Sequence, residues 1–266
     1  MVDIHNCENC PAHNIDNLVK LGINMSGFDY VVALAGNPNT GKSTVFNNLT
    51  GLRQHTGNWP GKTVTRAEGA FAVNNTKYKL IDLPGTYSLL STSTDEEVAR
   101  DFILFGQPDV TVIVVDATRL ERNLNLVLQV LEITDRAVLC LNLIDEAKRH
   151  KIEIDHRSLS RELGIPVVPA AARQKIGMDE LINKINEVAT GKYVCKPYRV
   201  KNISNKVSQV VEEITKNILK EFPELPNARW VAMRLLEGDQ SIINAVKTGE
   251  LGNIKSVSLI ASQQVA

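Results

Sequence analysis

The sequence lacks the features that mark membrane-spanning, secreted and nucleic-acid-binding proteins. Its 266 residues hold four cysteines, and the 30 basic side chains balance the 30 acidic ones. No apolar run approaches the ~20 residues that span a bilayer, and the N-terminus lacks the basic and apolar regions of a signal peptide. Four cysteines at this length suggest no disulfide framework. We therefore expect a chain that stays in the cytoplasm, without nucleic acid as a partner.

A glycine-rich loop is the most informative feature that is present. The residues Gly-Asn-Pro-Asn-Thr-Gly-Lys-Ser at 36–43 follow the apolar run 30–35 and precede a helix-compatible segment at 44–49. A strand, such a loop and a helix N-terminus together form a phosphate cradle. We expect Lys42 to reach the β- and γ-phosphates and the Ser43 hydroxyl to bind Mg²⁺. The other predicted nucleotide contacts in this stretch are Asn37, Asn39, Thr40, Gly41 and Thr44.

Two later motifs identify the nucleotide. Asp-Leu-Pro-Gly at 82–85 ends the apolar run 78–81, so Asp82 is placed to hold a water of Mg²⁺ and the Gly85 N–H to bond the γ-phosphate. Asn-Leu-Ile-Asp at 142–145 ends the run 136–141. We expect Asn142 and Asp145 to bind the base, because a carboxylate can accept from guanine N1–H and its 2-amino group, a donor pair that adenine lacks. The three motifs together favour GTP over ATP.

The runs between residues 30 and 190 alternate between strand-like and helix-like patterns. This alternation predicts an α/β fold with a mostly parallel, six-stranded sheet covered by helices. Asn74-Asn75 reads as a hairpin turn, so one strand pair should be antiparallel. The predicted strands are 30–35, 66–73, 77–82, 110–116, 136–142 and 165–169, and the predicted helices are 43–50, 95–105, 119–134, 155–163 and 178–189.

The remaining segments predict the domain organisation. We expect an N-terminal extension at 1–27, a nucleotide-binding domain at 28–190, and a small all-helical domain at 191–266. In the last of these, apolar residues recur at helical spacing and no strand pattern is convincing.

These residues resemble one family, the ferrous iron transporter B (FeoB) family, over roughly 28–266. The resemblance rests on the three motifs above and on Gly-Asn-Trp-Pro-Gly-Lys-Thr-Val at 57–64, which generic small GTPases lack. It implies a Ras-like P-loop GTPase domain and a helical domain on the cytoplasmic face of the cell membrane. In the full protein a polytopic iron-carrying region follows, so this chain is expected to be a soluble fragment. That membrane region and small accessory proteins of iron transport are the implied partners, and self-association stays open.

The resemblance also assigns roles to residues of the 57–64 stretch. Thr63 matches the switch threonine that joins Mg²⁺ and the γ-phosphate, and it is expected to act in hydrolysis with Lys42 and Gly85. The carbonyls of Gly57 and Trp59, with the Asn39 side chain, match ligands of K⁺ in potassium-stimulated members. A bound K⁺ would neutralise developing charge between the phosphates. The alternative for Trp59 is a plain hydrophobic anchor for its loop.

Two positions depart from the usual pattern. Thr86 stands where Ras-like enzymes often carry a water-orienting glutamine, so intrinsic hydrolysis should be slow. The base-side loop reads Ala-Ala-Ala-Arg at 170–173 and lacks the usual serine. A backbone N–H of Ala171 or Ala172 would then meet guanine O6 without help from a hydroxyl, and the nucleotide would be held loosely.

A possible metal site precedes these motifs. His5, Cys7, Cys10 and His13 supply two thiolates and two imidazoles, a set that suits Zn²⁺ or Fe²⁺. The alternative is a tail with incidental thiols.

Three functions remain open on the sequence alone. The first is the regulatory GTPase of a ferrous iron transporter, in which segments 51–64 and 82–95 change shape and the helical domain passes the change on. The second is a soluble GTPase of ribosome assembly or tRNA modification, although the mildly basic region 191–266 is a poor RNA-binding candidate. The third is a non-catalytic nucleotide-binding module, supported only by Thr86.

Overall fold

The computed structural model describes residue 13 and the ranges 15–52, 54–90, 93–199, 205–223, 225 and 227–247. The chain divides into two compact units, with the boundary between Tyr198 and Arg199. Within the described part, none of the helices combines the length and apolar character needed to cross a membrane.

The first unit is built on a seven-stranded sheet with the order β2-β3-β4-β1-β5-β6-β7. Strands β1, β4, β5, β6 and β7 pair in parallel, whereas β2 and β4 each pair antiparallel with β3. Five parallel strands bring their carboxyl ends to one edge, where ligands of such sheets bind. The strands are β1 Tyr30–Gly36, β2 Gln54–Asn58, β3 Thr65–Val73, β4 Thr76–Asp82, β5 Val110–Asp116, β6 Ala137–Asn142 and β7 Val167–Pro169.

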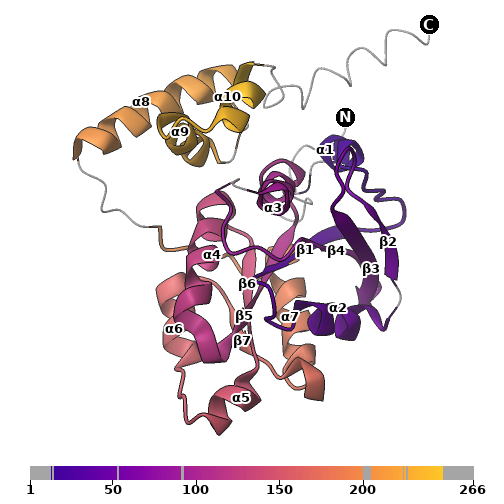
Figure 1. Cartoon of the computed structure of the whole chain (residues 1–266). Coiled ribbons are helices and arrows are strands. Elements are labelled where there is room, and N and C mark those ends of the chain that lie inside the picture. The colour runs from indigo at the N-terminus through magenta and orange to yellow at the C-terminus, as the bar shows by residue number, and fades with distance from the viewer. Residues whose placement is uncertain are drawn as a thin grey trace, which may run out of the picture. The chain divides into compact units, whose positions relative to one another are not determined.

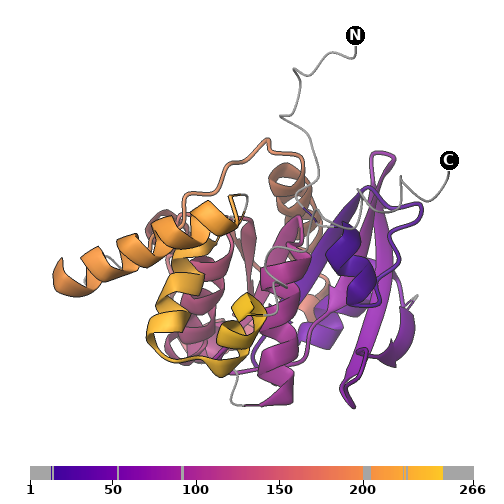
Figure 2. The same ribbon diagram turned by 90° about the horizontal axis from the view of Figure 1, so that it is seen from above.

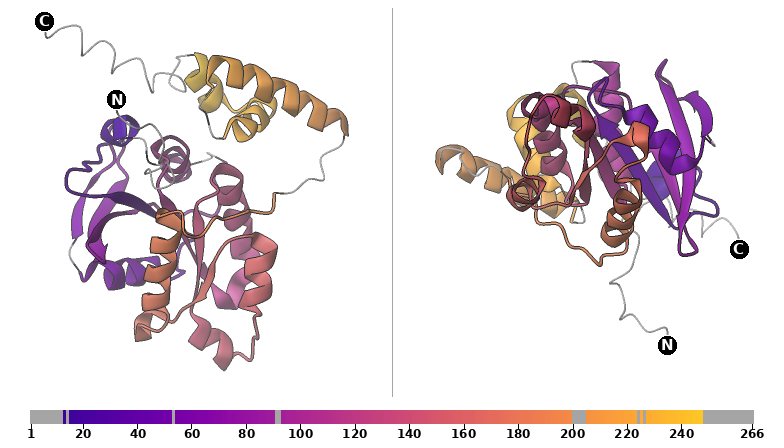
Figure 3. Two further views of the ribbon diagram at one scale, coloured as in Figure 1. Left: turned by 180° about the vertical axis from the view of Figure 1, so that it is seen from behind. Right: turned by 90° about the horizontal axis from the view of Figure 1, so that it is seen from below.

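Helices cover both faces of this sheet (Figures 1 and 2). They are α1 Ile15–Lys20, α2 Lys42–Thr50, α3 Thr94–Gly106, α4 Leu120–Ile133, α5 Ile144–Arg149, α6 His156–Leu163 and α7 Met178–Ala189. Helices α2 and α7 lie on one face, which the rear view shows (Figure 3), and they pack on alternate strand residues such as Val32, Val112 and Cys140. The intervening residues, such as Ala33 and Ile113, are also fully buried. Burial on both faces explains the continuous apolar runs of the central strands.

The second unit is helical in its described part. It contains α8 Asn205–Glu221, α9 Ala228–Leu236 and α10 Gln240–Lys247. Its buried residues include Val211, Trp230, Val231 and Ile242, whereas Val207 and Val210 of the predicted apolar stripe are exposed.

The prediction of a mostly parallel α/β sheet with one antiparallel hairpin is confirmed, but the strand number was wrong. The missed strand is β2, whose sequence Gln-His-Thr-Gly-Asn has no apolar alternation. It pairs with residues 65–69 along the edge of β3 opposite to β4, where the backbone groups of β3 are otherwise free in the described structure. Helices α1 and α5 were also missed, since six residues are too few for a readable period.

Gly69 on β3 marks where α2 crosses closest to the sheet. A Cβ at this position would lie 2.3 Å from Thr50 Cγ2 and 3.0 Å from Phe46 Cζ. Both neighbours belong to α2, and Phe46 is part of the core. Glycine at 69 therefore sets how closely α2, and the loop that precedes it, can approach the sheet.

We predict that Gly69→Ala lowers the free energy of unfolding by about 1–3 kcal/mol, because the added methyl overpacks this contact. Chemical denaturation measures the change. Gly57→Ala is the control, since a Cβ there meets nothing within 4 Å. The double variant with Thr50→Ser, which removes the clashing methyl, should recover part of the loss. Equal effects of the two glycine substitutions would contradict the prediction.

Candidate functional site

The loop after β1 is shaped by two close approaches. A Cβ on Gly36 would lie 2.5 Å from the Val114 carbonyl oxygen of β5, and one on Gly41 would lie 2.4 Å from Asn142 Nδ2. Gly41 also has φ +81°, and Asn39 has φ +65°. The Thr40 hydroxyl donates to the Asn37 carbonyl at 2.9 Å, which closes the turn. The loop is thus a tight bend that leads directly into the N-terminus of α2 at Lys42, as a phosphate cradle requires.

Lys42 and Asp82 meet at the carboxyl edge of the sheet, 40 residues apart in sequence. The Lys42 ammonium donates to the Asp82 carboxylate and, at 2.7 Å, to the Leu83 carbonyl. The two side chains are only 12% and 18% exposed. Burial raises the pKa of Asp82, and the Lys42 charge opposes that rise. The pair places one cation and one carboxylate where the sequence predicts phosphate and Mg²⁺.

The residues that follow Asp82 lie against the loop. The Thr86 N–H donates to the Gly36 carbonyl at 3.2 Å, and a Cβ on Gly85 would lie 3.5 Å from Pro38. Thr86 itself is buried. Gly85 is therefore close to the loop, as its predicted role requires, whereas the Thr86 N–H is already bonded to the Gly36 carbonyl.

Asn37 is the one fully buried amide of the loop whose polar atoms are unsatisfied. Its side chain is 2% exposed, and in the described residues neither its Oδ1 nor its Nδ2 has a hydrogen-bond partner. An unpaired buried amide is costly. A ligand or water that pairs with it would recover this cost, which suits its predicted place in the nucleotide site.

The base-side residues form a bridge between loops. Asn142 is buried, and its amide donates to the Thr40 carbonyl at 2.9 Å while its oxygen accepts from the Ala172 N–H at 3.0 Å. Asn48 Nδ2 donates to the Ala172 carbonyl at 2.6 Å. Asn142 thus fastens the phosphate loop to the loop after β7, a role that the motif alone did not reveal.

Asp145 and the alanine loop occupy the outer part of this region. Asp145 lies in the first turn of α5 and accepts from Gln174 Nε2 at 2.9 Å. The Ala171 N–H donates to the Ile176 carbonyl, and the Ala172 N–H is taken by Asn142. The expectation that one of these two N–H groups meets guanine O6 is not supported by this arrangement, because both already have protein acceptors.

The 57–64 stretch lies beside the phosphate region but is held elsewhere. Trp59 is 3% exposed and stands edge-on to Phe102 of α3, with ring centroids 5.5 Å apart. Its carbonyl accepts from the Lys62 N–H at 3.0 Å. Thr63 is exposed, and among the described residues its hydroxyl has no hydrogen bond to Ser43 or Asp82. In this structure the Trp59 ring is a hydrophobic anchor, and the role of Thr63 stays a prediction.

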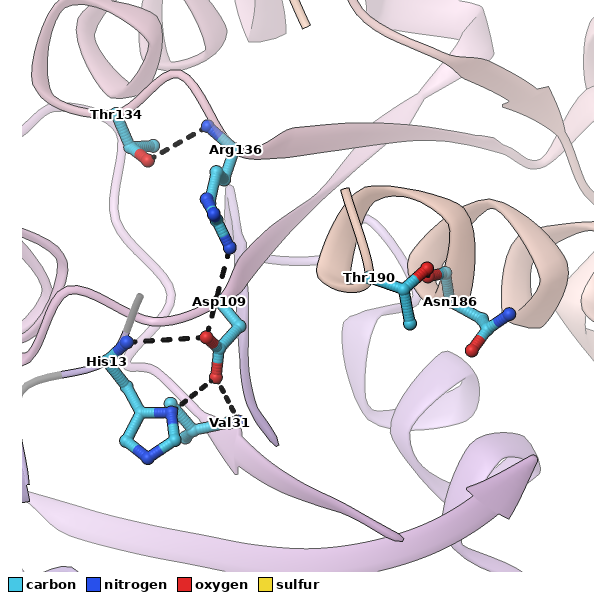
Figure 4. Close-up of polar contacts among 7 residues, drawn as sticks. All are labelled: His13, Val31, Asp109, Thr134, Arg136, Asn186 and Thr190. Carbon is cyan, nitrogen blue, oxygen red and sulfur yellow. Dashed lines mark hydrogen bonds and ion pairs between the residues drawn. The ribbon is translucent and has the colours of Figure 1, made fainter. Parts of the chain in front are cut away.

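His13 is the only member of the predicted N-terminal metal set within the described residues; His5, Cys7 and Cys10 lie outside them. Its Nδ1 lies 2.6 Å from Asp109 Oδ2, and the same carboxylate accepts from the Val31 N–H at 2.8 Å (Figure 4). No group of three potential metal ligands occurs in the described residues. The metal role stays a prediction. The His13–Asp109 pair was missed, since nothing in sequence links positions 96 residues apart.

Family comparisons agree with this geometry. A sequence model of the family described as ferrous iron transport protein B matches residues 30–185, and one described as the FeoB cytosolic helical domain matches residues 201–263. The Fe(2+) transporter FeoB of Salmonella typhimurium is 39% identical over 232 residues, which are 86% of this chain and 29% of that protein. The chain therefore spans less than a third of this relative.

Solved structures show the same fold. The cytosolic domain of T. maritima FeoB in its apo form matches with a TM-score of 0.74 and 38% identity, covering 84% of this chain and 86% of that one. Its GMPPNP form matches with a TM-score of 0.72 and 37% identity, over 84% and 86% of the two chains.

We predict that Asn142→Ala weakens guanine nucleotide binding and destabilises the first unit by about 1–3 kcal/mol, because it leaves the buried Thr40 carbonyl and Ala172 N–H unpaired. Calorimetry and chemical denaturation measure the two effects. Asn186→Ala is the control, since it removes the acceptor of the Tyr78 hydroxyl at the opposite edge of the sheet. It should cost stability and leave nucleotide affinity unchanged. The same loss of affinity in both variants would contradict the prediction.

Proposed function

The chain belongs to the ferrous iron transport protein B family, and we propose that it is the GTP-binding, GTP-hydrolysing part of an Fe²⁺ membrane transporter. The observation that carries the proposal is the meeting of Lys42 with Asp82 beneath the glycine-bounded loop 36–41. A partly buried cation, a partly buried carboxylate and a helix N-terminus at one sheet edge suit a nucleoside triphosphate with its metal ion. The full-length relatives named as Fe(2+) transporters and the GMPPNP form of a structural relative support it.

The phosphate chemistry follows from the Lys42–Asp82 pair. When nucleotide binds, we propose that Lys42 leaves Asp82 for the β- and γ-phosphates. Asp82, together with the Ser43 and Thr63 hydroxyls, would then hold Mg²⁺ and its waters. Mg²⁺ neutralises phosphate charge, and it also replaces the cation that Asp82 loses. Burial raises the pKa of Asp82, and a neighbouring cation acts against that rise.

Slow hydrolysis follows from the residues after Asp82. Thr86 is buried and its N–H is held by Gly36, so its side chain cannot orient an attacking water as a glutamine does. Gly85 remains available to bond the γ-phosphate through its N–H. We propose that Lys42, Thr63 and Gly85 stabilise the transferring phosphoryl group and that water positioning depends on other groups.

We propose that K⁺ binds beside the phosphates and stimulates hydrolysis. Asn39 is exposed at the tip of the loop, where its side-chain oxygen can face a cation, and its positive φ turns it outward. The carbonyls of Gly57 and Trp59 complete the proposed ligand set. The Trp59 carbonyl now accepts from Lys62, so this part of the site requires a rearranged loop.

We propose that the bound nucleotide controls the conformation of segments 51–64 and 82–95. The helical unit, α8 to α10, would pass this change to the membrane part of the full protein. An ordering that depends on the γ-phosphate and is lost after hydrolysis is the usual form of such a signal.

We predict that K⁺ raises GTP turnover and that Na⁺ at the same ionic strength does not. Phosphate release assays in the two salts measure the difference. The matched variant is Asn39→Gly, which keeps the positive φ but removes the side-chain oxygen. It should lose the stimulation by K⁺ while still binding GDP through the backbone of the loop. Equal turnover in K⁺ and Na⁺ would remove the potassium assignment, although GTP binding would stand.

We predict that Asp145→Asn weakens GTP and GDP while improving xanthine nucleotides, whose 2-oxo group needs a donor rather than an acceptor. Calorimetric titration with guanine and xanthine nucleotides measures the change in base preference. Asp155→Asn is the control, because Asp155 caps α6 through Arg157 and Ser158 on the surface. An unchanged base preference in Asp145→Asn, or no affinity of the unaltered chain for guanine nucleotides, would overturn the proposed function.

A further inference from the structure

The segment 15–28 packs on the nucleotide-binding unit although it precedes the stretch that the family model matches. In α1, Leu18 is fully buried, and the Asn17 amide donates to the Phe105 carbonyl of α3 at 2.9 Å. A Cβ on Gly106, the last residue of α3, would lie 3.3 Å from Leu18 and 3.4 Å from Leu21. The segment is therefore fixed to the C-terminal end of α3.

Two basic side chains of the sheet hold the second half of this segment by its backbone. Arg66 of β3 donates to the Leu21 carbonyl at 2.8 Å and to the Gly22 carbonyl at 3.0 Å. Lys79 of β4 donates to the Asn24 carbonyl at 3.0 Å. Glu68 lies between the two bases and pairs with both, at 2.8 and 2.6 Å. Charge-assisted bonds of this kind are stronger than neutral ones.

The same Arg66 guanidinium also covers Trp59. Its central carbon lies 5.3 Å from the centroid of the Trp59 ring, within the range of a cation–π contact. On its other side, Trp59 meets Phe102, and Lys62 pairs with Glu97 of α3 at 2.6 Å. Trp59 is therefore buried between α3 and Arg66, which also holds the segment 15–28.

In the described part of the chain, the packing around Trp59 leaves two buried N–H donors unpaired, which costs free energy. Among the described residues, Trp59 Nε1 and Arg66 Nε are both buried without a hydrogen-bond partner. A cavity of about 80 Å³ lies beside them and is lined by Lys20, Leu21, Trp59, Pro60, Lys62, Val98 and Asp101. Unpaired donors next to free volume indicate an arrangement that a modest rearrangement of the loop can relieve.

We propose that Arg66 is a positioning residue through which the segment 15–28 holds the loop 59–63 away from the nucleotide and so disfavours the GTP-bound state. The inference rests on the proposed function. GTP requires Thr63 to reach Mg²⁺ and the γ-phosphate, and the contact of Arg66 with Trp59, four residues earlier, opposes that movement. GDP makes no such demand. This contact therefore lowers affinity for a GTP analogue and leaves affinity for GDP unchanged.

The test uses the full chain carrying Trp230→Phe, so that Trp59 is its one tryptophan. Affinities for GMPPNP and GDP are measured by calorimetry, and Trp59 emission reports the position of the loop. Arg66→Met should raise the affinity for GMPPNP relative to GDP by about tenfold, or roughly 1.4 kcal/mol. Arg66→Lys, which keeps the charge but not the planar fork, should fall between. In the unaltered background, GMPPNP but not GDP should shift the emission of Trp59 to longer wavelength.

Two further variants separate positioning from general loosening. Lys79→Met is the matched control, because it frees the Asn24 carbonyl and one side of Glu68 but keeps the Arg66 bonds to the Leu21 and Gly22 carbonyls and the Arg66 contact with Trp59. It should change the affinity ratio less than twofold. Leu18→Ala loosens α1 from α3 without altering Arg66, and it should shift the ratio in the same direction as Arg66→Met.

An unchanged ratio in Arg66→Met and Leu18→Ala, or an equal shift in Lys79→Met, would overturn the inference. If the background protein bound no guanine nucleotide, the proposed function would be the claim that failed.

Discussion

The parallel pairing of β1 between β4 and β5 is the constraint on which the site depends. Pairing in register places Leu34 beside Asp82 and Gly36 beside Val114, so the ends of three strands lie within bonding reach. The approach is close enough that the Val114 carbonyl leaves no room for a Cβ on Gly36. Only this geometry allows Lys42, at the start of α2, to meet a carboxylate 40 residues away. The conformation of the phosphate loop therefore depends on the strand pairing of the sheet as well as on the loop's own sequence.

The sequence predicted the parts of this arrangement that are encoded locally. Continuous apolar runs identified the central strands because both faces of those strands are buried. The motifs identified Lys42 and Asp82 as functional residues that lie near the carboxyl ends of strands. The edge strand β2 could not be predicted, because its residues are polar and its pairing comes from the backbone of β3. The bridging role of Asn142 could not be predicted either, since both of its hydrogen-bond partners are backbone groups from distant loops.

Two unfavourable features occur together at the site. Burial raises the pKa of Asp82, and Lys42, which opposes that rise, is a cation that phosphates would also attract. Asn37 keeps both amide atoms unpaired in the described structure. In the proposed function, one kind of ligand, a phosphate group with a divalent cation, relieves both features. Local costs that one ligand removes are the expected mark of a binding site rather than of a structural core.

The loop 59–63, which we propose senses the third phosphate, differs from the phosphate loop in how it is held. The phosphate loop is fixed by buried backbone contacts between central strands, whereas the 59–63 loop joins a short, exposed edge strand to β3. Such a segment has little stability of its own, and elements that move are drawn from this end of the stability range. A few contacts therefore decide its position. Arg66 makes the contacts to Trp59 and to the Leu21 and Gly22 carbonyls with one guanidinium, so the N-terminal segment and the switch loop cannot shift independently while that side chain stays in place.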